Sequence, residues 1–216
     1  RGRVFPKRVS YGKEWKTEDK KAGFLTEDFN WTGDIFPRIP YHQALVYCMH
    51  VRGFTKHASS QVARRGTFAG IGEKIPYLKE IGVTTIELQP AYEFEEMQAA
   101  EEHVPMVSYG EKLQGGDSDR RNRLNYWGYS KGFYYAPKAA YASGGDGVRE
   151  FKELVKALHE DGMELVMQFY FPQEIKRSEI LEILCFWVLE YHVDGFHLLG
   201  ENLPVDMLAK DEVLAD

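Results

Sequence analysis

Four apolar runs, separated by stripes of helical period, constrain the fold of this chain more than any other feature. The runs cover residues 45–51, 83–90, 163–172 and 193–199. They are near-continuous rather than alternating, which is typical of strands covered on both faces. Between them, apolar residues recur at helical spacing over 71–81, 148–158 and 180–191, and Gly82 and Gly162 mark helix ends. The pattern predicts an α/β fold with a parallel sheet and right-handed crossovers.

The number of strands leaves the architecture open in one respect. A closed parallel barrel takes about eight strands, whereas four leave unpaired edges. From the residues alone, the chain is either a small open sheet or half of a larger fold. Residues 1–40 show no sustained period and are interpreted as an arm or the tail of a preceding domain, followed by the α/β part over 41–216.

Charge and hydropathy argue against several classes of partner. The net charge of −6 comes without a basic block, which argues against nucleic-acid binding. No apolar run approaches the ~20 residues of a membrane-spanning helix, so no membrane partner is expected. No signal peptide stands at Arg1, which favours a cytoplasmic location, although a chain that begins without methionine says little about its parent protein. Carbohydrate and other neutral partners stay open.

The cysteines and glycines give no sign of a cofactor. Cys48 and Cys185 lie in apolar runs far apart, so two buried thiols are expected rather than a disulfide scaffold, and neither has metal-ligand spacing around it. The glycines before Lys74 hint at a phosphate loop, but no Gly-Lys-Ser/Thr follows them. No metal and no cofactor is predicted.

The connection over 91–147 is long for a compact domain and is therefore a candidate functional region. It holds an acidic stretch over 93–102, a polar tip over 115–119 and an aromatic segment over 125–141 with one tryptophan and five tyrosines. We expect the tip to be mobile and the aromatic segment to be an ordered loop. Its rings either pack beneath the loop or form platforms for a ligand.

Few polar residues stand where a site of this fold is expected. His50, at the end of the first run, is either part of a site or a satisfied core histidine. Glu174 and Glu201 follow the third and fourth runs, and the carboxyl ends of strands hold the sites of parallel α/β folds. Glu87 and Asp194 lie within or before strand runs and are weaker candidates.

Five motifs occur in the same order as in a known family. They lie at 47–55 (YCMHVRGFT), 71–94, 125–137 (NYWGY and, three residues later, FYYAP), 151–159 (FKELVKALH) and 193–196 (VDGF). They resemble the catalytic domain of glycoside hydrolase family 13, the α-amylase family, and most closely its pullulanase, isoamylase and glycogen-debranching branch. Segments of that branch read Y-E-x-H-V-R-x-F-T, N-Y-W-G-Y, Y-F-A-P, E-F-K-x-M-V-x-x-L-H and V-D-G-F. The resemblance spans about 41–199.

The resemblance implies a TIM (β/α)8 barrel that is incomplete in this chain, which would hold its first four strand–helix units. Residues 41–216 would be the N-terminal half of the catalytic domain, in contact with the second half of the barrel. The arm over 1–40 would join a preceding β-sandwich domain. The implied partner is an α-glucan oligosaccharide or polysaccharide of the starch or glycogen type.

The resemblance also implies roles for individual residues. Tyr129 would stack on the sugar ring beside the bond that is cut, Trp127 and Tyr126 would shape that wall, and His50 would lie beneath the site. His197, which stands at the arginine of the family's G-F-R-x-D segment, is a further candidate for substrate binding.

The chain departs from the family at the positions that do the chemistry. Where members end the third strand with D-V-V-x-N-H, residues 168–173 read QFYFPQ. Where the fourth strand carries the aspartate nucleophile, this chain has Leu199, which cannot form the glycosyl-enzyme ester of retaining cleavage. The family's acid and third carboxylate follow strands five and seven, beyond Asp216. Glu201 is the nearby carboxylate that could substitute for the nucleophile.

Three interpretations follow. The first, which we adopt, is part of an α-glucan-acting glycoside hydrolase of the pullulanase or debranching type, expected to be inactive as this chain because of Leu199. The second is a non-catalytic α-glucan-binding or regulatory pseudoenzyme that keeps the aromatic platforms. The third is an unrelated open α/β domain.

Overall fold

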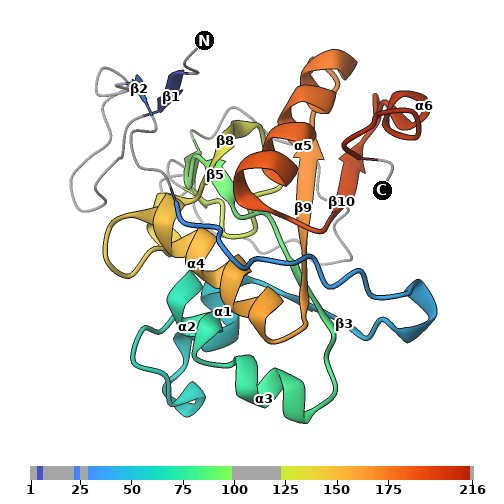
Figure 1. Cartoon of the computed structure of the whole chain (residues 1–216). Coiled ribbons are helices and arrows are strands. Elements are labelled where there is room, and N and C mark those ends of the chain that lie inside the picture. The colour runs from blue at the N-terminus through green and yellow to red at the C-terminus, as the bar shows by residue number, and fades with distance from the viewer. Residues whose placement is uncertain (1–3, 7–21, 25–28, 99–122, 215–216) are drawn as a thin grey trace, which may run out of the picture.

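A parallel sheet of four strands forms the centre of the molecule (Figure 1). The computed structural model describes residues 4–6, 22–24, 29–98 and 123–214. The sheet order is β10 (Gly195–Gly200), β9 (Glu164–Phe171), β4 (Thr85–Leu88) and β3 (Val46–Met49), and all three pairings are parallel. The predicted parallel sheet is confirmed, and neighbouring strands follow chain order as in part of a (β/α)8 barrel.

Helices lie on the connections between these strands. The link from β3 to β4 holds α1 (Val51–Lys56), α2 (Phe68–Gly72) and α3 (Ile75–Glu80). α4 (Gly147–Glu160) precedes β9, α5 (Arg177–Tyr191) precedes β10, and α6 (Val205–Leu208) follows it. The predicted stripes over 148–158 and 180–191 correspond to α4 and α5, and both helices are confirmed.

The core lies between the sheet and the helices α4 and α5. Trp187 of α5 is fully buried, with its ring centroid 5.3 Å from that of Phe151 on α4 and 5.3 Å from that of Phe169 on β9. Alternation along the strands sends one set of side chains towards these helices. The buried members of that set on β4 and β9 are Ile86, Leu88, Leu165, Met167, Phe169 and Phe171.

The other face of the sheet is open in the described part of the chain, and we call it the open face. On the edge strand β3, Val46 on this open face is 48% exposed, and Tyr47 on the opposite face, beside Ile86, is 38% exposed. The expectation that this run is covered on both faces is therefore wrong. Cys48 is exposed and Cys185 is only partly buried, so the expectation of two buried thiols is wrong as well. Cys48 is exposed because β3 lies at the sheet edge.

The single helix predicted over 71–81 is wrong, because the chain forms α2 and α3 there instead. Pro76 lies at the start of α3 and has no backbone N–H to bond the carbonyl of Gly72, so a continuous helix would lose that bond. The Glu73 carboxylate, at the break, accepts hydrogen bonds from the backbone N–H groups of Ala63 and Arg64 at 2.8 and 3.1 Å.

The long connection between β4 and α4 holds more regular structure than expected. β5 (Tyr92–Phe94) pairs with β8 (Gly132–Pro137), and β6 (Met97–Gln98) pairs with β7 (Arg123–Leu124), both antiparallel. The aromatic segment is therefore partly a strand, which corrects the prediction of a loop. Gly132 permits this pairing, because a Cβ there would lie 2.3 Å from the Glu93 carbonyl oxygen. The polar tip over 115–119 lies outside the described residues.

Near the N-terminus, β1 (Val4–Pro6) pairs with β2 (Ala22–Phe24), and the segment 29–39 packs on the ends of α4 and α5. The Asp34 carboxylate lies 2.8 Å from His159 Nδ1 and 2.5 Å from His192 Nδ1. His159 Nε2 lies 3.0 Å from Asp194, the residue before β10. We call these four residues the Asp34 clamp. It shows that at least the end of the predicted arm is fixed to the α/β part.

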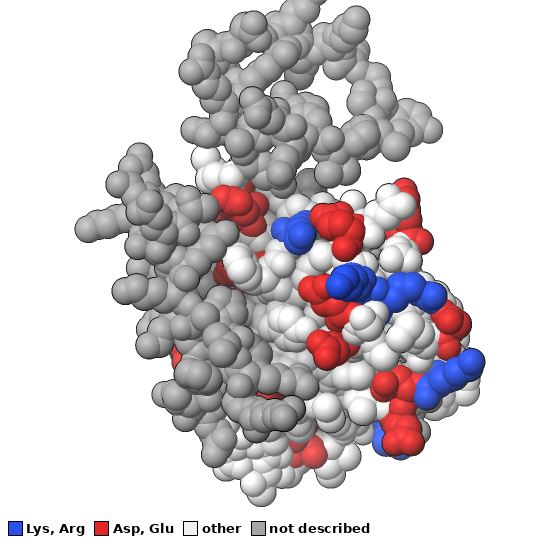
Figure 2. Space-filling view, turned by 90° about the horizontal axis from the view of Figure 1, so that it is seen from above, with Lys and Arg blue, Asp and Glu red and all other residues white. Residues whose placement is uncertain are grey.

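Two surface properties bear on the partners. No helix within the described ranges is long and apolar enough to cross a bilayer. Figure 2 shows acidic and basic side chains interspersed on the face turned to the viewer, with no continuous basic area on the part not covered in grey.

Candidate functional site

Three rings of the aromatic segment lie beside the end of β3, and we call Tyr126, Trp127 and Tyr129 the aromatic wall. Trp127 is 46% exposed, and the two tyrosines are partly buried. Between them, Gly128 has a φ of +76°, and a Cβ there would lie 2.3 Å from the Phe94 ring. The positive φ and the close approach to Phe94 both require glycine. Gly128 therefore determines the path of the backbone between Trp127 and Tyr129.

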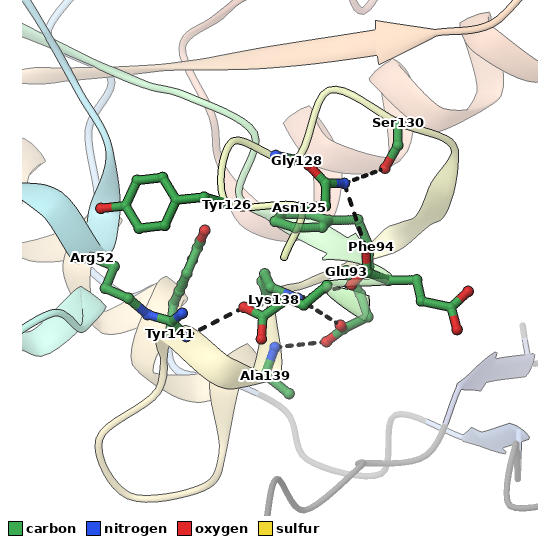
Figure 3. A network of polar contacts seen from close by, with 12 residues as sticks. Arg52, Glu93, Phe94, Asn125, Tyr126, Gly128, Ser130, Lys138, Ala139 and Tyr141 are labelled. Atoms are coloured by element: carbon green, nitrogen blue, oxygen red, sulfur yellow. Dashed lines mark hydrogen bonds and ion pairs between the residues drawn. The ribbon is translucent and has the colours of Figure 1, made fainter. Parts of the chain in front are cut away.

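Side-chain hydrogen bonds hold the turn that carries the aromatic wall (Figure 3). The Asn125 Oδ1 accepts from the backbone N–H of Gly128 at 3.0 Å, and its Nδ2 donates to Ser130 Oγ at 2.9 Å. From below, the buried Tyr92 hydroxyl lies 3.0 Å from the Gly128 carbonyl oxygen and 2.9 Å from that of Ser130. The turn is therefore anchored through both its backbone and its side chains.

A buried cation lies under this region, at the centre of Figure 3. The Lys138 Nζ donates to the Phe94 carbonyl oxygen at 2.8 Å and to Glu93 Oε1 at 3.2 Å, and it lies 3.7 Å from Glu96 Oε1. Arg52 from α1 reaches the same Glu96 oxygen at 3.3 Å. We call these four charged side chains the Lys138 network. Burial lowers the pKa of Lys138, and the charges of Glu93 and Glu96 offset this only in part.

His50 connects the sheet to the aromatic wall. Its Nδ1 accepts from the backbone N–H of Gly53 at 3.0 Å and caps α1, so the ring proton lies on Nε2 and is donated to the Tyr126 carbonyl oxygen at 2.8 Å. Its ring stacks on that of Tyr126, with centroids 4.2 Å apart and planes 9° apart. Burial lowers the pKa of His50, which favours the neutral ring that this bonding requires.

A second polar group lies on the open face, at the middle strands. Tyr129 donates its hydroxyl to Gln168 Oε1 at 2.5 Å, and Gln168 Nε2 donates to Glu87 Oε1 and, at 3.4 Å, to Cys48 Sγ. His197 donates from Nδ1 to the same Glu87 oxygen at 2.7 Å. We call these five residues the Glu87 cluster. Strand register produces it, since Cys48 pairs with Glu87 and His197 with Gln168.

The cluster changes the acidity of two of its members. Burial raises the pKa of the Tyr129 hydroxyl, with a smaller contribution from the neighbouring Cys48. Burial and the charge of Glu87 raise the pKa of the Cys48 thiol. Tyr129 and Cys48 therefore stay protonated at neutral pH, and the tyrosine is a hydrogen-bond donor.

The structure brings all five predicted substrate-binding residues to two adjoining groups. His50 and Tyr126 stack, and Trp127 contacts both rings edge-on. Tyr129 and His197 are joined through Gln168 and Glu87. Their roles towards a ligand stay predictions.

The carboxylates that follow strands do not enter these groups. Glu201 is exposed directly after β10, and Glu174 is exposed and lies 3.7 Å from Lys131. Leu199 is partly buried and stands two positions after His197, so it points to the same face of β10.

Sequence reasoning ranked Glu87 as a weaker candidate and did not place Gln168 or Cys48 in a site. Glu87 stands between Ile86 and Leu88, both fully buried on the helix side, so alternation alone places its carboxylate on the opposite face. The signal in the sequence was a charged residue within an apolar run that was predicted to be covered on both faces. Chemically, the rings, amide, imidazole and hydroxyl suit a neutral ligand that carries hydroxyl groups.

Comparison with known sequences identifies the family. Residues 49–173 match the family model for the alpha amylase catalytic domain. Isoamylase 1, chloroplastic, of Arabidopsis thaliana is 33% identical over 79% of this chain and 26% of its own length. A glycogen operon protein GlgX homolog of Mycobacterium tuberculosis is 34% identical over 87% of this chain and 31% of its own length. The chain thus spans about a quarter to a third of these relatives.

Solved structures show the same fold. The pullulanase of Paenibacillus barengoltzii, in complex with maltohexaose and alpha-cyclodextrin, has a TM-score of 0.58 at 21% identity, over 78% of this chain and 32% of that one. Pullulanase type I of Bacillus subtilis, complexed with maltose, has a TM-score of 0.61 at 22% identity, over 83% of this chain and 30% of that one. The parallel strands, the ordered motifs and these matches agree, and the chain belongs to the α-amylase family, glycoside hydrolase family 13, in its branch of isoamylases, GlgX proteins and pullulanases.

Proposed function

We propose that the protein containing this chain binds an α-glucan at the aromatic wall and that the described part of the site supplies no nucleophile for cleaving it. The observation that carries the second part of this proposal, the missing nucleophile, is Leu199. It occupies the family's nucleophile position, on the same face of β10 as His197. A hydrocarbon side chain has no lone pair with which to attack an anomeric carbon, so the glycosyl-enzyme ester cannot form there.

The ligand class is supported by the chemistry of the site and by the structural neighbours. Flat, partly exposed rings pack against the apolar faces of sugar rings, and the polar groups around them can bond sugar hydroxyls. The pullulanase neighbours bind maltohexaose and maltose, as their names state. We therefore assign an α-linked glucan to this site.

The domain organisation belongs to the same proposal. Residues 41–216 are the first half of a (β/α)8 catalytic domain, and residues 1–40 are an arm from a preceding domain. Two features support this: the strands follow chain order across the sheet, and β3 and β10 each pair on one side only within the described ranges. The second half of the barrel is then the partner of these two edges.

Replacing Tyr129 with alanine in the intact gene product is expected to weaken maltohexaose binding about tenfold or more, because the variant loses one stacking ring and its anchored hydroxyl. Isothermal titration calorimetry measures this. Tyr77→Ala is the control, since Tyr77 is 45% exposed on α3, outside the aromatic wall, and its loss should leave binding unchanged. Absence of saturable binding by the wild-type protein would end the proposal.

A second candidate function is α-glucan hydrolysis with Glu201 as a substitute nucleophile. The observation in its favour is that Glu201 directly follows β10 and is exposed, so its carboxylate is accessible. Under our proposal, the gene product releases no reducing sugar from pullulan or maltodextrin. Release that Glu201→Gln abolishes would establish this second function, and release that survives the substitution would point to another carboxylate.

A further inference from the structure

Glu87 is a largely buried carboxylate on the open face, beneath side chains that are more exposed. Its Oε1 accepts two hydrogen bonds, from His197 Nδ1 at 2.7 Å and from Gln168 Nε2. The Glu87 side chain is only 16% exposed, whereas that of His197 is 52% exposed. The carboxylate therefore lies beneath more accessible groups and contacts them from below.

The first of these bonds decides the state of the imidazole. An ionised carboxylate can only accept hydrogen bonds, so the neutral His197 ring carries its proton on Nδ1. The Nε2 of the same ring is then a bare acceptor. With the side chain half exposed, this nitrogen is open to a donor from a ligand, such as a sugar hydroxyl.

The second bond decides the direction of the amide. Because Glu87 accepts, it bonds the NH2 group of Gln168, and the amide oxygen must point the other way. That oxygen accepts the Tyr129 hydroxyl at 2.5 Å. Gln168 is 5% exposed, so an amide turned the wrong way would leave a buried group unpaired. Glu87 thus fixes the orientation of the Gln168 amide, and that amide in turn fixes the hydroxyl of Tyr129 in the aromatic wall.

We propose that Glu87 is the positioning residue of the glucan site: it sets the tautomer of His197 and, through Gln168, fixes the ring of Tyr129. This inference rests on the proposed function, since it concerns the same site. Glu87 itself contacts no ligand in this role. It acts as a hydrogen-bond acceptor, so an uncharged acceptor of the same shape can replace it and a hydrocarbon cannot.

The first experiment needs no variant of Glu87 and no ligand. Nitrogen-15 NMR of histidine in the gene product at neutral pH is expected to show the ring of His197, identified by the signal lost in His197→Gln, with its proton on Nδ1. A proton on Nε2 would overturn the inference. This result does not depend on whether the protein binds a glucan, so failure of the proposed function is seen separately, as absent maltohexaose binding.

The second experiment compares two substitutions. Glu87→Gln is expected to keep the His197 tautomer and to bind maltohexaose within about threefold of wild type. Glu87→Leu is expected to lose the tautomer preference and about tenfold in affinity. Glu182→Leu, which replaces an exposed glutamate on α5, is the control and should behave as wild type. A wild-type tautomer and affinity in Glu87→Leu would refute the role, as would equal losses in both variants at position 87.

Discussion

Replacing Lys138 with methionine is expected to lower the free energy of unfolding by about 3–5 kcal/mol and to abolish glucan binding. Its side chain is 0% exposed and neutralises Glu93 and Glu96, whose side chains are only 13% and 11% exposed. Methionine fills similar space but leaves, among the described residues, Glu93 without a cation and Glu96 with Arg52 alone, and the two poorly solvated carboxylates repel each other. The turn carrying the aromatic wall should loosen, because the Lys138 network lies directly beneath it.

Urea unfolding of the intact protein, followed by tryptophan fluorescence, measures this loss. The matched control is Lys131→Met, which removes a solvent-exposed pair with Glu174 at 3.7 Å and should cost at most about 1 kcal/mol. Adding Glu93→Gln to Lys138→Met should recover part of the loss, since the carboxylate that has lost its cation is removed. A Lys138→Met protein as stable as the control variant would show that the network contributes little.

Replacing His159 with leucine is expected to have an effect of the same size, about 3–5 kcal/mol. The imidazole lies between Asp34 and Asp194, whose side chains are 1% and 6% exposed, and its own side chain is 1% exposed. Leucine would leave two buried carboxylates facing each other. Thermal unfolding near pH 6 measures the loss, and His42→Leu, at an exposed histidine, is the control expected to stay near wild type.

The same residue should make stability depend on pH. Burial alone would lower the pKa of His159, but hydrogen bonds to Asp194 and Asp34 and the charges of these carboxylates outweigh it and raise the pKa. The folded state therefore holds the proton more tightly than the unfolded state. This stabilisation is complete below about pH 6.5, the unfolded value, and is lost as the pH rises through the folded value. His159→Leu should abolish that slope, and an unchanged slope would assign it to another group.

The sequence alone predicted the strands and helices whose signal is local. Near-continuous apolar runs and the apolar stripe of α4 are properties of neighbouring residues, and they were sufficient to predict these strands and this helix. The break at Pro76 could have been read from the chain as well, because a proline there removes a helix bond. β8 could not, since it depends on pairing with β5 some 40 positions earlier, which a local period does not reveal.

The site was predicted unevenly for a similar reason. The motifs led to the aromatic wall and to His50, because each motif is a short stretch of neighbouring residues. The Glu87 cluster joins residues from five separate segments, and only strand register brings Cys48 opposite Glu87 and His197 opposite Gln168. A charged residue in an apolar run indicates a polar cluster on the sheet, but the other members of the cluster become known only when the strands are paired.

The Asp34 clamp fastens the chain at the amino ends of β9 and β10, whereas the aromatic wall adjoins the opposite, carboxyl ends of the strands. Ile35, next to the clamp, is 75% exposed, so it offers a place for a dye or a biotin handle. A protein immobilised through that position would present the end that holds the aromatic wall to the flowing solution.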